Sequence, residues 1–223
     1  EGAKEVFDPL AVMVVENEEA QPVITPVHGW DDSLFLRGKA PMTKQEVRAL
    51  AISKLRPEAD HIVYDIGTGT GSCSVELAFQ VPYGKVYGFE INEEAASLAE
   101  ANKERFNACN LEIIRGNALE KIVNMPCPDR VFIGGTKGNL KEILDILYKK
   151  NAYCRIVITA ITLETAGAVT AYYKEHTDYE LETTQLFASE GRRVGPYTLM
   201  EGHNPVYVMT AYCKEAEYEG QSK

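Results

Sequence analysis

The feature that most constrains the fold is a short apolar segment that runs directly into a glycine-rich loop. Residues 62–66 are apolar apart from Asp65, and they precede a loop with the sequence Gly67-Thr68-Gly69-Thr70-Gly71. Residues 72–80 then show the pattern of a helix. Glycines permit a tight turn and let backbone N–H groups approach a ligand closely. The order strand, loop and helix predicts a unit that binds a nucleotide-type cofactor, with a purely structural turn as the alternative.

The rest of the chain alternates between strand and helix patterns. We expect strands at residues 61–66, 85–90, 111–115, 130–133, 155–160, 179–188 and 206–213, and helices at 43–54, 72–80, 93–106, 140–149 and 163–175. Thr43 and Glu46 form a capping box for the first helix, and Asn92 caps the third. Continuous apolar strands separated by helices indicate an α/β fold with a parallel sheet covered on both faces. A seven-stranded, mostly parallel sheet with an antiparallel C-terminal hairpin is the plan of the class I, Rossmann-like methyltransferases.

Polar residues at consecutive strand ends point to S-adenosylmethionine as the cofactor. Asp65 stands two residues before the loop, where it suits the cationic amino group, directly or through water. Glu90 ends the second strand 90 − 71 = 19 residues after Gly71, which matches the ~20 residues expected for a carboxylate that binds ribose hydroxyls. Asn117 and the Ala118 backbone follow the third strand and suit the adenine edge. NAD is the alternative, disfavoured by the GxGxG spacing and by the closing hairpin.

Composition narrows the classes of partner. The chain has 23 Lys and Arg against 33 Asp and Glu, a net charge of −10, which disfavours a nucleic-acid partner. No run of about 18 apolar residues suggests a membrane span. The five cysteines are scattered and form no CxxC pair, so we expect reduced thiols in a cytoplasmic protein and no metal site.

The chain divides into three regions. Residues 1–28 have a β-like run and a Pro-rich stretch, residues 29–215 carry the alternating pattern, and residues 216–223 form a tail. The tetrapeptide Asn204-Pro205-Val206-Tyr207 is similar to the NPPY motif of amino-methyltransferases acting on nucleic acids. That motif follows the fourth strand, whereas this one lies in the final hairpin, so we interpret it as mainly structural, with a role in a substrate pocket as the alternative.

Several stretches resemble one family. They are His28-Gly29-Trp30-Asp31-Asp32, the block of residues 37–48, the glycine loop, and Ile133-Gly134-Gly135. Together they resemble the CbiT-type half of the decarboxylating precorrin-6Y C(5,15)-methyltransferases of cobalamin biosynthesis, over residues 29–214. Residues 7–25 resemble the tail of the CbiE-type half, which implies a piece of a fused CbiE–CbiT protein.

The resemblance implies methylation of carbon 15 of a precorrin or cobalt-precorrin, with loss of carbon dioxide from the ring C acetate. It also implies that Thr43 contacts the cofactor and that the protein is a homotetramer. The family usually has GGSGG after the fourth strand, whereas this chain has Lys137 in that stretch.

Cations are the candidate ligands for the carboxylates of such a substrate. We expect them to gather locally on an acidic protein; the candidates are Arg37, Lys39, Lys44, Lys137, Arg192 and Arg193. A solvated charged loop is the alternative for Arg192 and Arg193, and a surface or subunit contact is the alternative for Arg37 and Lys39. We identify no catalytic triad, and any catalytic residue is unknown. A tRNA or protein methyltransferase and a non-catalytic cofactor-binding module are the competing functions.

Overall fold

A seven-stranded sheet forms the middle layer of the molecule, which is described here by a computed structural model of residues 27–215. The strand order is β3-β2-β1-β4-β5-β9-β6. The strands are β1 (Ile62–Ile66), β2 (Lys85–Glu90), β3 (Leu111–Arg115), β4 (Arg130–Ile133), β5 (Arg155–Ala160), β6 (Tyr179–Leu186) and β9 (Val206–Cys213). The expectations for residues 1–26 and 216–223 lie outside the described residues.

The direction of the strands confirms the predicted fold class. Strands β1 to β5 pair in parallel, and β9 lies antiparallel between β5 and β6. The chain moves outward from β1 to β3 and then returns to β4 on the other side of β1. This reversal opens a crevice at the carboxyl ends of β1 and β4, where α/β sheets bind their ligands.

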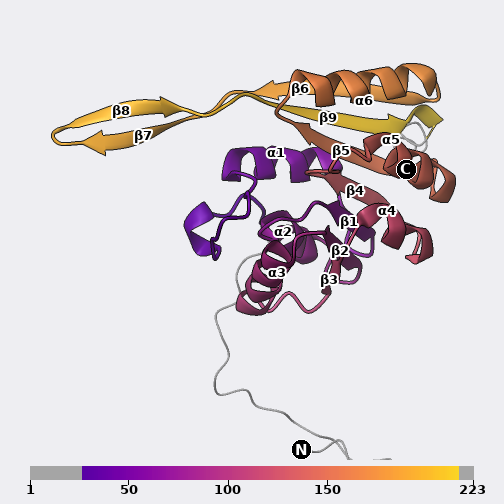
Figure 1. Cartoon of the computed structure of the whole chain (residues 1–223), viewed down its shortest axis with the longest axis horizontal. Helices are drawn as coiled ribbons and strands as arrows, with labels where there is room; N and C mark the ends of the chain where they lie inside the picture. Colours follow the sequence, from indigo (N-terminus) through magenta and orange to yellow (C-terminus); the bar gives the residue numbers. More distant parts are fainter. Residues whose placement is uncertain (1–26, 216–223) are drawn as a thin grey trace, which may run out of the picture.

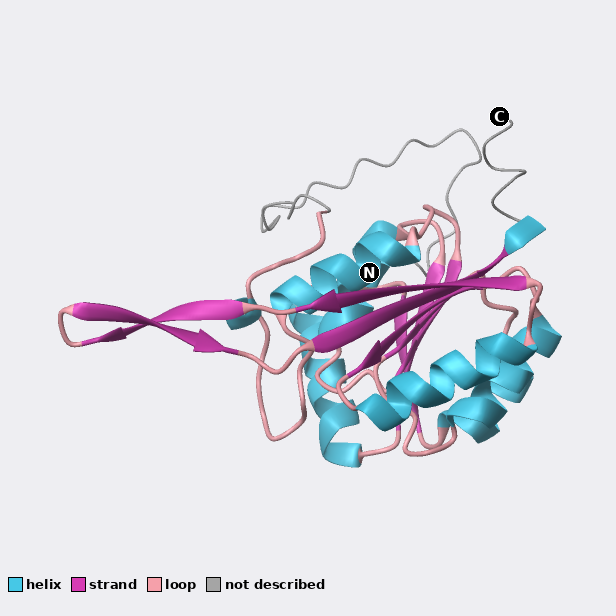
Figure 2. Cartoon of the chain, turned by 90° about the horizontal axis from the view of Figure 1, so that it is seen from above, coloured by secondary structure: helices cyan, strands magenta, loops and turns pink. Residues whose placement is uncertain are grey.

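Helices cover both faces of the sheet, as Figure 2 shows. The helices are α1 (Gln45–Leu55), α2 (Ser72–Gln80), α3 (Glu93–Arg105), α4 (Ala118–Lys121), α5 (Leu140–Lys150) and α6 (Leu163–Glu175). One apolar cluster joins α1 and α2 to the sheet through residues such as Leu55 and Leu77. A second cluster joins α5 and α6 to the opposite face through residues such as Leu147 and Val169. The sheet is therefore buried on both faces, which explains its continuous apolar strands.

The two predicted helix caps have different outcomes. Asn92 caps α3, because its side chain accepts a hydrogen bond from the Ala95 N–H at 2.9 Å. The capping box at Thr43 is wrong: α1 begins at Gln45 after Lys44, with no side-chain cap. The physical reason is tertiary, since the Thr43 carbonyl accepts a hydrogen bond from Arg48 and its hydroxyl lies against the Cys73 thiol.

An irregular segment before α1, residues 29–44, packs across the face that carries α2 and α3, and we call it the strap. A 3-10 turn, η2 (Asp32–Leu34), is its regular part. Trp30 and Phe35 are buried, and their rings pack on Phe106 with centroids 5.1 and 4.9 Å away. Burying aromatic area in this way anchors the strap to the body of the domain.

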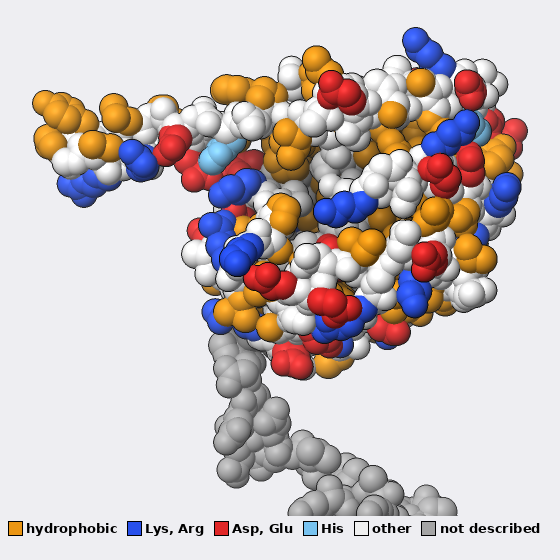
Figure 3. All heavy atoms as spheres, in the orientation of Figure 1, with side chains coloured by type: hydrophobic (Ala, Val, Ile, Leu, Met, Phe, Trp, Pro, Cys, Tyr) orange, Lys and Arg blue, Asp and Glu red, His pale blue; other side chains and the backbone are white. Residues whose placement is uncertain are grey.

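A two-stranded ribbon lies between the last two strands of the sheet, where no strand was expected from the sequence. Strands β7 (Ser189–Val194) and β8 (Tyr197–Gly202) pair antiparallel and project away from the body (Figure 1). All residues of both strands are exposed. Figure 3 shows apolar side chains gathered at the far end of the ribbon. Among the described helices, none is both long and apolar enough to cross a bilayer.

Candidate functional site

A cavity of about 690 Å³ lies at the carboxyl ends of the parallel strands. This volume is within the range of roughly 300–1,000 Å³ that small-molecule sites occupy. Its walls come from the strap, the glycine loop, the ends of β2 and β3, the loop after β4, and the segment after β5. Segments from the N-terminal part to the C-terminal part of the domain therefore form the site. It lies around the crevice that the strand order creates.

The glycine loop fits tightly between two other backbone segments. A Cβ atom on Gly67, which has φ +78°, would lie 2.6 Å from the Gly135 carbonyl oxygen. A Cβ on Gly69, with φ +56°, would lie 2.6 Å from the Pro41 carbonyl oxygen. Only glycine suits such positions, because they combine positive φ with close backbone approach. The glycine loop is thus held in place by the loop after β4, at Gly67, and by the strap, at Gly69.

Asp65 lies behind the glycine loop and does not line the cavity. Its Oδ2 accepts hydrogen bonds from Thr68 Oγ1 at 2.9 Å and Ser74 Oγ at 2.5 Å. Burial raises the pKa of Asp65 to about 6, although the hydrogen bonds from Ser74 and Thr68 oppose that shift. Of the two expected modes, direct contact or contact through water, this geometry favours the one through water. Asp65 Oδ1 has no partner among the described residues, so it can still receive a hydrogen bond relayed from a bound cation.

Glu90 is the carboxylate that the second strand delivers to the cavity wall. Its Oε2 accepts from the Gly69 N–H at 2.9 Å, and its Oε1 accepts from the Asn92 N–H at 2.9 Å. Only 9% of the residue is exposed. Glu90 therefore links the glycine loop to the start of α3. Each carboxylate oxygen retains acceptor capacity for a further donor such as a sugar hydroxyl.

Asn117 and Ala118 lie on the same wall, at the start of α4. The Asn117 side chain caps that short helix by accepting from the Leu119 N–H at 3.1 Å. Both residues line the cavity beside Gly116. The side-chain amide N–H₂ of Asn117 makes no hydrogen bond to a described residue, and it is the group that suits an adenine acceptor.

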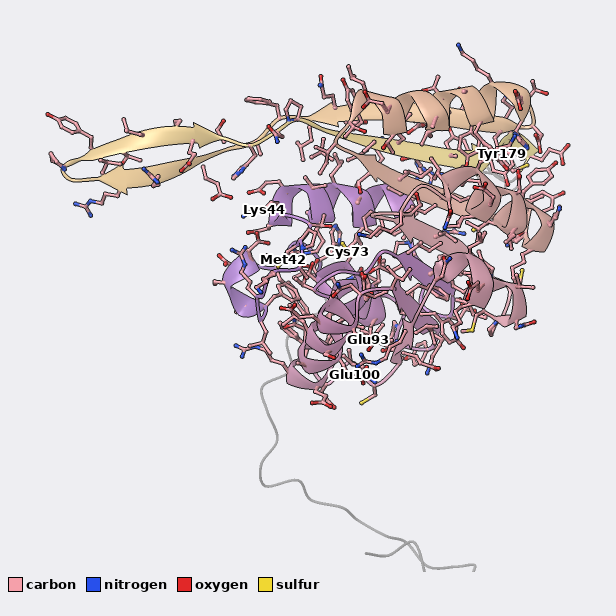
Figure 4. All side chains as sticks on the ribbon, in the orientation of Figure 1. Met42, Lys44, Cys73, Glu93, Glu100 and Tyr179 are labelled. Carbon is pink, nitrogen blue, oxygen red and sulfur yellow. The ribbon has the colours of Figure 1, made fainter. Side chains whose placement is uncertain are left out.

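The other predicted cofactor residues divide into two groups. Thr43, Gly67, Thr68 and Gly69 line the cavity. Thr70 and Gly71 lie beneath it, because Thr70 is 1% exposed and Gly71 occupies the left-handed cap position that starts α2. Figure 4 places Met42 and Lys44 of the strap near Cys73 of α2, with Glu93 on α3 below them.

The predicted substrate cations are also divided. Lys39 and Lys137 line the cavity, and neither makes an ion pair with a described residue. Arg37 pairs with Asp32 at 3.1 Å and lines a separate polar cavity instead. Arg192 pairs with Glu201 at 3.6 Å on the ribbon, and Arg193 is exposed beside it. The two ribbon arginines do not line the cavity of their own chain, because the ribbon that carries them projects away from the body.

One wall of the cavity was not expected from the sequence. It comprises Ile158, Thr159, Ala160, Ile161, Thr162 and Thr165, together with Val206. Ile161 remains 66% exposed at the rim. Val206 belongs to the tetrapeptide interpreted as structural, and it begins β9. The available signal was the position of these residues at the carboxyl end of β5, where ligand sites of such sheets lie.

The chemistry of the donor set fits S-adenosylmethionine. The cavity presents a carboxylate at Glu90, an amide at Asn117 and a cradle that only glycine allows at Gly67 and Gly69. No serine, cysteine or histidine lines it. The described walls therefore provide binding and orientation without a nucleophilic triad.

Comparison with known sequences agrees with this geometry. The family described as "Precorrin methyltransferase domain" matches residues 34–212. The chain belongs to this family. This precorrin methyltransferase domain is 40% identical over 196 residues to a protein of Pyrobaculum calidifontis named "Probable cobalt-precorrin-6B C(15)-methyltransferase (decarboxylating)". That match covers 86% of this chain and 98% of the relative.

Solved structures of relatives share the architecture. A precorrin-6Y C5,15-methyltransferase of Geobacter metallireducens is 36% identical to the precorrin methyltransferase domain, with a TM-score of 0.79 over 85% of this chain and 98% of that one. A protein of Methanobacterium thermoautotrophicum described as precorrin 8W decarboxylase is 32% identical, with a TM-score of 0.76 over 81% and 98%.

Proposed function

We propose that this precorrin methyltransferase domain methylates carbon 15 of a precorrin or cobalt-precorrin and removes carbon dioxide from the ring C acetate, in cobalamin biosynthesis. The observation that carries the proposal is a single cavity with two kinds of wall. The glycine loop, Glu90 and Asn117 form a nucleoside-type wall, and the segments after β4 and β5 form a second wall with Lys137 and Ile161. The names of the relatives support the same reaction.

Glu90, Asn117 and the backbone of the glycine loop would hold S-adenosylmethionine. Glu90 would accept from the ribose hydroxyls, and Asn117 with the Ala118 backbone would contact adenine. Thr43 and Thr68 lie where the strap and the loop meet the cavity. Asp65 would act through a bridging water. The bound cofactor supplies the methyl group as a sulfonium, which is already a good leaving group.

Lys39 and Lys137 would receive carboxylates of the substrate. They come from the strap and from the loop after β4, two separate segments of the wall. Lys137 has φ +52° and precedes Gly138 at φ +94°, a left-handed pair that turns the loop toward the cavity. Apolar side chains of the same cavity, such as Ile158 and Ile161, suit the face of a macrocycle.

The chain contributes mainly by orientation. Holding the acceptor carbon in line with the methyl group and the sulfur can supply ~7–11 kcal/mol in favourable cases. Bound S-adenosylmethionine would supply the methyl group for carbon 15, its sulfur keeping the bonding electron pair as a neutral thioether. The conjugated ring of the substrate would take the electron pair released with carbon dioxide. Neither step requires a nucleophilic side chain.

The proposal extends to assembly. We infer a homotetramer whose contacts include the ribbon, because an isolated two-stranded hairpin is at best marginally stable in water. Its exposed apolar side chains include Tyr197, Leu199 and Met200, which are 71%, 56% and 69% exposed. A CbiE-type domain of which residues 7–25 are the tail, and a cytoplasmic location, belong to the same proposal. They rest on sequence resemblance and on reduced cysteines.

The deciding experiment is an assay with cobalt-precorrin and precorrin substrates, following carbon dioxide release and methyl transfer from labelled S-adenosylmethionine. We expect both products in equal amounts from one of the two substrates. Methyl transfer to tRNA or protein with none to either tetrapyrrole would refute the proposal.

A further inference from the structure

The strap forms part of the cavity wall, yet it has almost no regular structure of its own. Lys39, Ala40, Pro41, Met42, Thr43 and Lys44 all line the cavity. Among these six residues, only the Lys44 carbonyl takes part in a backbone hydrogen bond of a helix, accepting from the Arg48 N–H at 2.8 Å, and none of the six belongs to a helix or strand. Their position must therefore come from side chains of the domain body that bind the strap.

Arg48 of α1 is the first such side chain. Its guanidinium donates to Glu76 Oε1 at 2.5 Å and to Asp32 Oδ1 at 3.0 Å. It also donates to the carbonyl oxygens of Thr43 at 2.5 Å and Trp30 at 2.6 Å. Arg48 and Glu76 are both fully buried. One guanidinium thus ties both ends of the strap to α1 and α2.

Glu76 completes the same attachment from α2. Its carboxylate accepts from the Gly29 N–H at 2.5 Å and from the Trp30 N–H at 3.1 Å. Burying an ion pair costs desolvation free energy, and a well-packed apolar pair of similar size is often as stable. Stability alone therefore does not account for this pair, whereas its directional bonds to the strap do.

Asn102 of α3 attaches the middle of the strap directly to the glycine loop. Its Oδ1 accepts from the Leu36 N–H at 2.7 Å. Its Nδ2 donates to the carbonyl oxygens of Leu36 at 3.1 Å and Thr70 at 2.8 Å. Asn102 is fully buried, so one amide connects the strap to the loop that it covers.

We infer that Arg48 and Asn102 are positioning residues that hold the strap against the glycine loop and thereby set the affinity for the cofactor. Neither residue lines the cavity: Arg48 acts through the strap, and Asn102 acts through the strap and through its hydrogen bond to Thr70 of the glycine loop. The contact between the Pro41 carbonyl and Gly69 transmits their effect, since the strap backbone leaves no room for a Cβ there. The inference rests on the proposed function for the identity of the cofactor, but the attachment itself exists without any ligand.

The test compares three variants of the chain. The double variant Arg48→Met, Glu76→Met removes the attachment without leaving an unpaired buried charge. Asn102→Ala removes the second attachment independently. Arg155→Met is the matched control: Arg155 is 5% exposed, donates to the Lys54 carbonyl and lies over the Tyr212 ring, and it does not line the cavity.

Two measurements separate positioning from general stability. Hydrogen exchange of the ligand-free proteins should be at least about tenfold faster across residues 29–44 in both attachment variants, while the sheet stays protected. Calorimetric titration should give a Kd for S-adenosylmethionine raised at least about tenfold. Arg155→Met should lower the melting temperature without changing either readout.

Either attachment variant that folds with wild-type exchange in the strap and a Kd within about threefold of wild type would overturn the inference for that residue. If the wild-type chain does not bind S-adenosylmethionine, the proposed function fails instead. The exchange rates then still decide whether these residues hold the strap.

Discussion

Replacing Glu90 with glutamine is the sharpest perturbation of the cofactor wall, because it keeps the shape of the side chain. The carboxylate accepts the Gly69 and Asn92 N–H groups, one on each oxygen. A glutamine must turn its N–H₂ group toward one of these donors, so that hydrogen bond is lost. The uncharged side chain is also a weaker acceptor for a ribose hydroxyl.

The expected loss follows from the charged hydrogen bonds. Hydrogen bonds to a charged group contribute about 1.5–3 kcal/mol. That loss corresponds to a Kd for S-adenosylmethionine raised about 10- to 140-fold. Isothermal titration calorimetry measures it directly, and thermal unfolding without ligand shows whether the fold has changed.

Glu94→Gln is the matched control. Glu94 also lines the cavity, but it is exposed and makes no hydrogen bond or ion pair to a described residue. The Kd of the Glu94→Gln variant for S-adenosylmethionine should stay within about threefold of the wild-type value. A Glu90→Gln variant that binds as tightly as Glu94→Gln would refute the role given to Glu90.

Three further outcomes are expected. Gly67→Ala should lower the free energy of unfolding by about 2–4 kcal/mol, since its Cβ would strike the Gly135 backbone at positive φ; Gly167→Ala on α6, where a Cβ meets nothing within 4 Å, should be neutral or stabilising in the same urea titration. Because burial raises the pKa of Asp65 to about 6, the folded state retains a proton that the unfolded chain has released. Between about pH 4 and 7 the stability of the wild type should therefore fall by about 2 kcal/mol relative to Asp65→Asn. Equal slopes of unfolding free energy against pH for the two proteins, measured by urea titration, would contradict this. Leu199→Glu should reduce the mass measured by light scattering, whereas Tyr83→Glu should not; a monomeric wild type would contradict the tetramer.

Most of the sheet could be predicted because its buried positions are occupied by continuous runs of apolar residues. Residues 72–80 and 85–90 were predicted with the bounds of α2 and β2. Apolar strands buried on both faces leave a continuous pattern that few other structures share. The carboxyl ends of those strands then placed Glu90 and Asn117 on one wall without any knowledge of side-chain contacts.

The features that were missed depend on contacts between distant segments. The ribbon lacks a buried face, so β7 and β8 carry no alternating pattern. Thr43 has the local sequence of a cap, but Arg48 takes its carbonyl. Asp65 stands at a familiar position before the loop, yet hydrogen bonds from Thr68 and Ser74 keep it behind the wall. None of these contacts is encoded by spacing along the chain.

The ribbon is inserted next to the wall of the cavity. It leaves the body after Leu186 and returns at Val206, a residue that both begins β9 and lines the cavity. Leu186 and Val206 are paired in the sheet, so the base of the ribbon adjoins the cavity wall. Binding of the ribbon to a neighbouring copy of the chain would then affect the conformation of that wall. Assembly and substrate affinity would then be linked thermodynamically, and substrate would shift the equilibrium between free and assembled chains as much as assembly shifts the affinity.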